Sequence, residues 1–499
     1  MPLSLLRKSS ENAEKETPLS ESVFTDLNID QILDKVCDGW DEDVRSLYAS
    51  FPSCKEDEEY RRAVYADIRN DQVYSALFKY HSFIKARLDY SSKIENAYEL
   101  VQKRVWYLRV IYTYVSSLVT LDADLKKAQL RSEGMKAFSS FLSSYLSDPG
   151  FKNLYSESTS LWKELSDFHV VLSYDKGHFT ITNGTAPGAY EKFLTELFPG
   201  EKSVFDNPFT DTEYYSDLEA EIVRLFTRKN KEFFRKLEKF CSDYPSVDNK
   251  ELSSVESEMV YYLAFAAFER YMKKQGFEMN MPEASDDKLS ADDLYDLALA
   301  ITNTELGKKV VSNPLMLSGD ESFFVLTGPN QGGKTTYGRS LGQLIWFSKM
   351  GFSVPAASAC VPYFTDLCTH FSVEESAESG RGKLMDELVR LRPIMDDSRD
   401  GAFVVINELF TTAANFDAVE MGQRVLRKLI SKKCRGIYVT HLSELTEAGT
   451  GVVSLIAEVD ENNNQTFRIG RSMPVEVNTV NKLVVKYRLT YDQLKERFS

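Results

Sequence analysis

The sequence is poor in the residues that bind metal ions or form disulfides. Its 499 residues include five histidines and six cysteines, and no two cysteines form a C-x-x-C pair. Structural zinc sites usually need such pairs, so the composition argues against zinc and against a histidine-rich metal site. We interpret the cysteines as reduced thiols of a cytoplasmic protein. They are Cys37, Cys54, Cys241, Cys360, Cys368 and Cys434.

Long hydrophobic runs and net positive charge are also lacking. The longest apolar run, Met259–Phe268, is about half of what a bilayer-spanning helix needs. Met1–Thr17 is polar and charged, so it does not resemble a secretory signal, and we expect no membrane partner. With a net charge of −15, the chain should repel nucleic acid except where basic residues gather locally.

The first part of the chain has a mainly helical pattern. Residues 1–20 are rich in Ser, Glu and Lys and are predicted to be a disordered tail, and residues 21–293 are predicted to be a helical domain. Glu95–Leu121 lacks proline and glycine, which predicts one helix about 40 Å long. A helix of this length fits either a lever arm or an ordinary core helix. The region 170–182 interrupts this pattern, because two β-rich runs flank Asp175-Lys176-Gly177 and predict a β-hairpin.

A second long helical stretch, beginning near Asp211, carries a basic face. Its cations suit contact with a phosphate backbone, but four glutamates nearby also suit a solvated, charge-balanced face, which we favour. The basic residues are Arg228, Lys229, Lys231, Arg235, Lys236 and Lys239, and the acidic ones are Glu219, Glu221, Glu232 and Glu238.

From about residue 294 to 499 the pattern changes to alternating strands and helices, which is typical of an α/β domain. The predicted strands are Lys309–Leu317, Phe323–Leu326, Phe403–Ile406 and Gly436–Thr440, and the predicted helices are Thr335–Lys349 and Ala418–Lys432.

One stretch of this domain predicts a nucleotide site. Directly after the strand Phe323–Leu326, the residues Gly328, Pro329, Asn330, Gln331, Gly332, Gly333, Lys334, Thr335 and Thr336 fit G-x-x-x-x-G-K-[ST]. Glycines let backbone N–H groups turn toward phosphate oxygens, and a helix N-terminus favours negative charge. Lys334 is predicted to neutralise phosphates of ATP, and the Thr335 hydroxyl to bind Mg²⁺.

A second pair of candidate residues ends the strand Phe403–Ile406. Glu408 stands where a carboxylate could polarise an attacking water, and Asn407 stands where an aspartate is usual on the metal side. An amide attracts Mg²⁺ less than a carboxylate does, so we expect slow, magnesium-dependent ATP hydrolysis.

Five segments together resemble the MutS family: TGPNQGGKTT, GFSVPA, ESGRGKLMDEL, INELFTTAANFDA and VTHLSEL. The resemblance implies a C-terminal ABC-type phosphate-loop ATPase domain, acting as a dimer, after a helical core and lever domain. It is strong from about Lys309 to Leu445 and weaker before that. The Phe-x-Glu element of the family's mismatch-reading domain is absent from this sequence.

The resemblance also implies roles for further residues. His441 matches the histidine proposed to sense the γ-phosphate. Ser379, Gly380 and Gly382 match the signature segment that would reach the partner subunit's nucleotide, although the family usually has a hydroxyl residue at the position of Gly382. Phe410–Asp417 matches the loop along the dimer interface.

The sequence therefore favours a MutS-like ATPase that hydrolyses ATP in a composite dimer site and drives a DNA clamp in mismatch repair or related DNA metabolism. The expected partners are a second copy of the chain, DNA (duplex, mismatched or branched) and a repair protein.

 The alternative is a nucleotide-gated protein scaffold with slow hydrolysis and no direct mismatch recognition, which the net charge of −15 and Asn407 favour. The sequence does not decide between a homodimer and a heterodimer.

Overall fold

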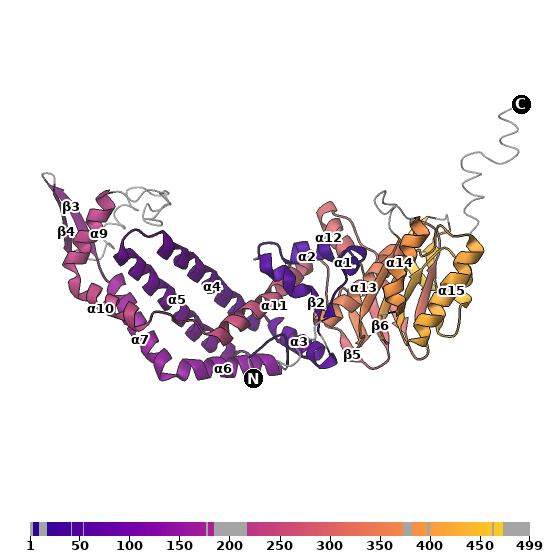
Figure 1. The fold of residues 1–499 in the computed structure, drawn as a ribbon, viewed down its shortest axis with the longest axis horizontal. Helices are drawn as coiled ribbons and strands as arrows, with labels where there is room; N and C mark the ends of the chain where they lie inside the picture. The colour runs from indigo at the N-terminus through magenta and orange to yellow at the C-terminus, as the bar shows by residue number, and fades with distance from the viewer. Residues whose placement is uncertain are drawn as a thin grey trace, which may run out of the picture. The chain divides into compact units, whose positions relative to one another are not determined.

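The computed structural model describes residues 3–8, 17–40, 42–52, 54–175, 178–183, 217–372, 382–396, 400–461 and 464–472 (Figure 1). The chain forms two compact units. Unit 1 comprises residues 1–69, 132–134 and 257–499, and unit 2 comprises residues 70–131 and 135–256. Residues 1–69 and 257–293 belong to the same unit as the α/β region. The predicted domain boundary near residue 294 therefore stays a prediction.

The beginning of the chain is part of the unit 1 core. Leu5 is fully buried and Leu6 nearly so. The Ser4 hydroxyl donates to the Glu258 carboxylate at 2.9 Å, and the Leu5 amide donates to the same group. A disordered tail was predicted here because Ser, Glu and Lys dominate the segment, but burial of two leucines outweighs that composition over residues 3–8.

A six-stranded sheet forms the centre of the α/β region. Its strand order is β10-β11-β12-β8-β13-β14, and every neighbouring pair is parallel except β13 and β14. Such a sheet carries its loops and ligands at the carboxyl ends of the strands. The strands are β8 (Phe323–Thr327), β10 (Leu367–Phe371), β11 (Phe403–Asn407), β12 (Arg435–Val439), β13 (Val452–Val459) and β14 (Gln465–Arg471).

Helices cover both faces of this sheet (Figure 1). The helix α13 (Lys334–Met350) packs on β11 and β12, where a Cβ at Gly338 would lie 3.2 Å from Val439. On the other face, α14 (Lys383–Asp396) and α15 (Asn415–Ser431) pack against alternate residues of the same strands. Central strands are apolar throughout because both faces are buried.

A four-stranded sheet adjoins this core within unit 1. Its order is β5-β9-β6-β7, in which β5 pairs with β9 in parallel and the other pairs are antiparallel. The strands are β5 (Glu283–Ser285), β6 (Leu289–Leu294), β7 (Asn313–Leu317) and β9 (Ser358–Pro362). The helices of unit 1 also include α1 (Glu21–Asp26), α2 (Ile29–Val36), α3 (Lys55–Ile68) and α12 (Leu297–Leu306).

Unit 2 is built mainly from long helices. The pair α4 (Asp71–Asn96) and α5 (Leu100–Lys127) makes its most extensive contact, and α7 (Pro149–Ser166) and α10 (Lys231–Asp243) pack on α5. Both α6 (Glu133–Ser147) and α11 (Lys250–Lys274) begin in one unit and end in the other. The predicted hairpin is confirmed as β3 (Val170–Asp175) and β4 (His178–Asn183), followed by α9 (Asp217–Lys229).

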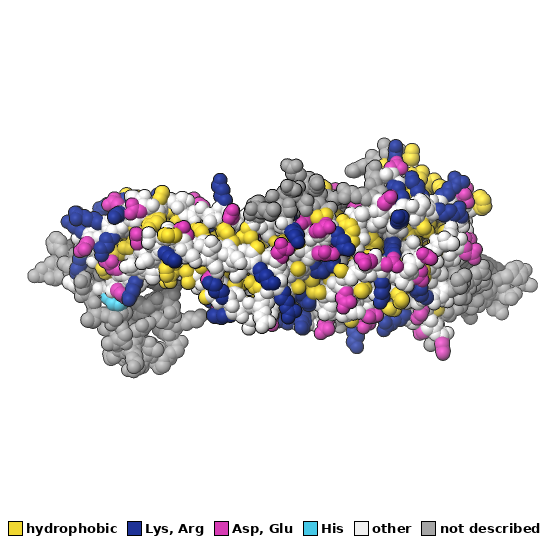
Figure 2. All heavy atoms as spheres, turned by 90° about the horizontal axis from the view of Figure 1, so that it is seen from below, with side chains coloured by type: hydrophobic (Ala, Val, Ile, Leu, Met, Phe, Trp, Pro, Cys, Tyr) yellow, Lys and Arg dark blue, Asp and Glu magenta, His cyan; other side chains and the backbone are white. Residues whose placement is uncertain are grey.

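The surface carries both signs of charge close together. On the face drawn in Figure 2, Lys and Arg side chains alternate with Asp and Glu over the described residues. Within the described part of the chain, no helix is long and apolar enough to cross a membrane.

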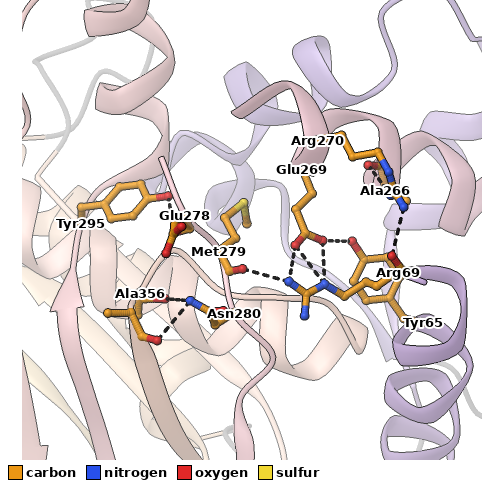
Figure 3. A network of polar contacts seen from close by, with 11 residues as sticks. Tyr65, Arg69, Ala266, Glu269, Arg270, Glu278, Met279, Asn280, Tyr295 and Ala356 are labelled. Atoms are coloured by element: carbon orange, nitrogen blue, oxygen red, sulfur yellow. Dashed lines mark hydrogen bonds and ion pairs between the residues drawn. The ribbon is translucent and has the colours of Figure 1, made fainter. Parts of the chain in front are cut away.

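A buried polar network fixes the end of α3, where the chain leaves unit 1 (Figure 3). Arg69 donates through Nη2 to Glu269 on α11 at 2.6 Å and to the Met279 carbonyl at 3.1 Å. The Tyr65 hydroxyl donates to the same carboxylate. Burial and the Glu269 charge raise the pKa of Tyr65 well above its usual value, so the phenol stays a donor. The network therefore ties α3 to α11 and to the segment before β5.

The end of α13 packs closely on α3, and a glycine makes this possible. Gly351 has φ of 86°, and a Cβ there would lie 2.8 Å from the Arg61 Cβ and 2.9 Å from the Arg62 amide nitrogen. Gly276, after α11, has the same φ of 86° but nothing within 4 Å of a built Cβ.

These two glycines allow a matched test of the packing. We expect Gly351→Ala to destabilise the fold by about 1–3 kcal/mol more than Gly276→Ala. Both substitutions put alanine at the same unfavourable φ, but only the alanine at 351 would crowd the backbone of α3. Urea unfolding of the two variants measures the difference. Equal free energies of unfolding would contradict the close contact between α13 and α3.

Candidate nucleotide site

The loop between β8 and α13 brings the predicted phosphate-binding residues to the carboxyl edge of the sheet. Its conformation depends on glycine: φ is 129° at Gly328 and 86° at Gly333, and Gln331 is also left-handed at 62°. A Cβ at Gly328 would lie 2.9 Å from the Ala457 Cβ on β13, and one at Gly332 would lie 3.1 Å from it. The loop thus lies directly against β13, which leaves room there for no larger residue.

Lys334 is held inside this loop. Its ammonium donates to the carbonyls of Gly328 at 2.8 Å and Pro329 at 2.9 Å, and the residue is 5% exposed. Burial lowers the pKa of Lys334, while the negative charge of Glu408 opposes that shift. The lysine is therefore placed at the start of a helix, where a phosphate group would meet both the ammonium and the backbone amides of the first helical turn.

The two predicted metal-side residues contact each other. The Thr335 hydroxyl donates to the Asn407 side-chain oxygen at 3.0 Å, which joins the first turn of α13 to the end of β11. Both side chains offer oxygen atoms, the ligands that Mg²⁺ prefers, but neither carries a charge. Within the described residues, no group of three or more His, Cys, Asp or Glu is suited to holding a metal ion.

Glu408 follows Asn407 and faces the same region. Its backbone is left-handed, with φ of 53°, and its amide donates to the Val439 carbonyl at 2.9 Å. Phe410, two residues later, is also left-handed at 64°. Positive φ is costly for residues other than glycine and is found where the surroundings impose it, often at functional sites.

A cavity of about 680 Å³ lies beside the loop. Of the predicted site residues, it is lined by Asn330, Gln331, Gly332, Gly333, Lys334, Thr335, Thr336 and Glu408. Its other walls come from the segment before β7, from α12 and from β14, with Val310, Val311, Leu299 and Phe467 as apolar members. A mostly preformed cavity with an apolar side and a polar end is typical of a small-molecule site.

The remaining predicted residues are placed differently. Gly328 and Pro329 bind the lysine but do not line the cavity, and neither do Asn407 and His441. His441 follows β12 and is exposed. Gly382 lies exposed just before α14, whereas Ser379 and Gly380 lie outside the described residues.

Phe467 is a cavity residue that the sequence did not indicate. It is 45% exposed, has φ of 58° and would lie 3.4 Å from a Cβ at Gly333. The Asn313 side chain holds this part of the backbone with two hydrogen bonds. Its Nδ2 donates to the Phe467 carbonyl at 3.0 Å, and its Oδ1 accepts from the Ile469 amide at 2.8 Å. Gln465 donates to the Asn330 carbonyl at 2.9 Å. No motif links these distant positions, so only the folded chain brings them together.

A buried histidine lies on β10, the strand beside β11. His370 on β10 is 1% exposed, and its Nε2 donates to the Glu387 carbonyl on α14 at 3.1 Å. Burial lowers the pKa of His370 to about 4. The imidazole is therefore neutral at pH 7.

Fold and site together define an α/β protein whose parallel sheet carries a glycine-rich, lysine-containing loop beside a ligand-sized cavity. Residues 324–478 match the family model described as MutS domain V. The chain is 28% identical over 155 residues to the DNA mismatch repair protein MutS of Fervidobacterium nodosum, which covers 30% of this chain and 19% of that protein. It is 26% identical over 171 residues to MutS of Syntrophomonas wolfei, which covers 33% and 20%.

The α/β region of this chain is similar to domain V of the MutS family. The similarity lies in the α/β region, and the alignments span about a fifth of the length of the curated relatives. The family resemblance read from the sequence is thereby confirmed, as is a mixed α/β region joined to a helical one.

The neutral state of His370 predicts a pH dependence of stability. Its pKa is lower in the folded chain than in the unfolded chain, so the unfolded chain binds the proton first as pH falls. The part of the unfolding free energy that depends on a neutral His370 is complete above about pH 6.5. It is lost as the pH falls toward 4, at up to about 1.4 kcal/mol per pH unit. We expect His370→Gln, which keeps a donor for Glu387, to flatten the decline of the unfolding free energy between pH 7 and pH 5. An unchanged decline would contradict a buried neutral imidazole.

Proposed function

We propose that this chain binds ATP at the β8–α13 loop and hydrolyses it with Mg²⁺ in a MutS-like, ABC-type ATPase domain. The observation that carries the proposal is the convergence of Lys334, the loop amides and Glu408 on one cavity edge. Phosphoryl transfer needs charge neutralisation and positioning more than covalent chemistry, and these groups supply both.

The chain's own residues divide this work. Lys334 and the amides of the loop bind phosphate oxygens, with the dipole of α13 adding to the attraction. Glu408 orients and polarises a water at the same edge. His441 completes the proposed set as a γ-phosphate sensor, a role that comes from the family resemblance and requires this exposed side chain to turn toward the cavity.

Thr335 and Asn407 fit a magnesium ion as oxygen donors. When bound, Mg²⁺ neutralises charge on the phosphates. Because the pair is uncharged and already hydrogen-bonded at 3.0 Å, it attracts a cation less than a threonine–aspartate pair would, which supports slow turnover.

Phe467 extends the proposal to the base of the nucleotide. Its ring lies at Gly333 and lines the cavity together with Val310 and Val311. An aromatic ring together with aliphatic side chains in one cavity suits stacking of a planar base, and such stacking is insensitive to base identity.

We propose further that two copies of the chain form the complete site. In this arrangement Ser379, Gly380 and Gly382 reach the partner's nucleotide, and ATP closes the dimer. Gly382 is exposed at the start of α14, and a Cβ there would meet nothing within 4 Å, which supports access by a partner.

The proposed binding partner is DNA, in mismatch repair or related DNA metabolism. Curated relatives are named DNA mismatch repair proteins, and unit 2 offers cations for a phosphate backbone. Lys236 pairs with Glu164 at 3.2 Å, but Arg228, Lys231, Arg235 and Lys239 have no ion-pair partner within the described residues. A repair protein is a further proposed partner.

A nucleotide-gated scaffold is the second candidate. The uncharged Thr335–Asn407 pair favours it, because weak magnesium binding would leave ATP bound for long periods. In that case nucleotide binding would control a protein partner, and DNA affinity would not respond to ATP.

Variants of the loop and of the strand end test the ATPase. We expect Lys334→Ala to abolish ATP binding, and Glu408→Gln to bind ATP while losing turnover by about 10²–10⁴-fold, because only the general base is removed. Fluorescent-nucleotide binding and phosphate release measure the two steps. The control is Lys428→Ala, which removes an exposed lysine of α15 that pairs with Asp396 of α14 at 3.6 Å. Unchanged ATP binding by Lys334→Ala would refute the site.

A DNA-binding screen separates the two candidate functions. We expect the Glu408→Gln protein to change its affinity for duplex, mismatched or branched DNA when ATP is added at low salt. Replacing Arg235 and Lys239 by Gln should weaken binding and reduce the salt slope by about 0.9 for each lost phosphate contact, whereas Lys236→Gln should change both less. No response to ATP on any of these DNA substrates would favour the scaffold.

A further inference from the structure

The turn after β11 is strained and must be held by its neighbours. Glu408 and Phe410 have φ of 53° and 64°, values that are unfavourable for residues other than glycine. The Glu408 amide donates to Val439, which fixes the start of the turn. The second strained residue needs a separate anchor.

Glu387 on α14 provides that anchor. Its Oε2 accepts from the Phe410 amide at 3.0 Å, and its Oε1 lies 3.5 Å from the Thr411 hydroxyl, which donates to it. The residue is 3% exposed. Hydrogen bonds to a buried carboxylate are stronger than those between neutral groups, so this contact can hold a left-handed residue.

The helix α14 is itself fixed by the beginning of the chain. Arg390 forms an ion pair with Asp26 of α1 at 3.1 Å and donates to the Phe371 carbonyl at 2.7 Å. Asp26 also accepts from the Thr369 hydroxyl at 2.8 Å, and its carbonyl accepts from Arg339 of α13 at 2.9 Å. Asp26 of α1 therefore joins α13, β10 and α14.

We propose that Glu387, kept in place by the Asp26–Arg390 ion pair, is the positioning residue that sets the direction of the Glu408 carboxylate. It acts through the backbone of Phe410 and does not touch the cavity. A chain of contacts thus runs from α1 through α14 to the proposed general base. This inference rests on the proposed function, in which Glu408 activates water.

The test is a double-variant cycle on ATP hydrolysis. Glu387→Gln keeps the shape and one acceptor oxygen but removes the charge. We expect kcat to fall roughly tenfold to a hundredfold, the cost of a small misplacement, with the KM for ATP changed by less than about twofold. In the Glu408→Gln background the same substitution should give no further loss, because its effect passes through Glu408.

Two further measurements keep the test decisive if Glu387→Gln folds poorly. Asp26→Asn acts through Arg390 and α14, so it should lower kcat less than Glu387→Gln does and leave the KM for ATP unchanged. The control Glu420→Gln, which breaks the exposed Glu420–Arg424 pair, should change neither kcat nor KM. Hydrogen exchange of the segment 409–413 should rise in both Glu387→Gln and Asp26→Asn.

The outcomes separate this inference from the proposed function. Equal kcat losses in the wild-type and Glu408→Gln backgrounds, or unchanged exchange over 409–413 in both variants, would overturn the role of Glu387 alone. If wild-type protein shows no hydrolysis that depends on Lys334, the proposed function fails first, and this inference fails with it.

Discussion

The burial of α13 is the constraint on which the rest of unit 1 depends. From Tyr337 to Met350 every residue except Arg339 is buried, so its polar side chains need internal partners. Gln343 donates to the Leu27 carbonyl at 3.0 Å and to Asp296 at 2.9 Å, and Lys349 donates to the Phe364 carbonyl. Since an unpaired buried polar group costs about 1–3 kcal/mol, these contacts fix the position of the helix as well as stabilise it.

The position of α13 decides the geometry at both of its ends. At the first end lie Lys334 and Thr335, bonded to the loop carbonyls and to Asn407. At the other end, Gly351 allows the backbone of α3 to approach, and the Tyr261 hydroxyl donates to the Met350 carbonyl at 2.7 Å. A rigid buried helix with fixed ends links the nucleotide loop to α3 and α11, the helices that lead into unit 2.

Much of the α/β region could be predicted because its signals are local. The strand Phe323–Leu326 and the helix Thr335–Lys349 were found within one or two residues of β8 and α13, since an apolar run, a glycine loop and a helical stripe follow one another directly. The hairpin at 170–182 was equally local. The order of residues 3–8 is not visible in local composition, because Leu5 and Leu6 are buried and the Leu5 amide donates to Glu258, 253 residues away.

The resemblance to the MutS family, the phosphate-loop motif and the pair Asn407-Glu408 can all be read from the order of the residues, because each depends on residues that are adjacent in the chain. Only the tertiary structure brought Phe467 and Asn313 to the loop, and only it placed Glu387 against Phe410 and Asp26 against Arg390. These contacts join segments with no shared periodicity, and two of the residues involved have left-handed backbones that no local propensity predicts. Long-range packing fixes these contacts, so they exist only in the folded chain.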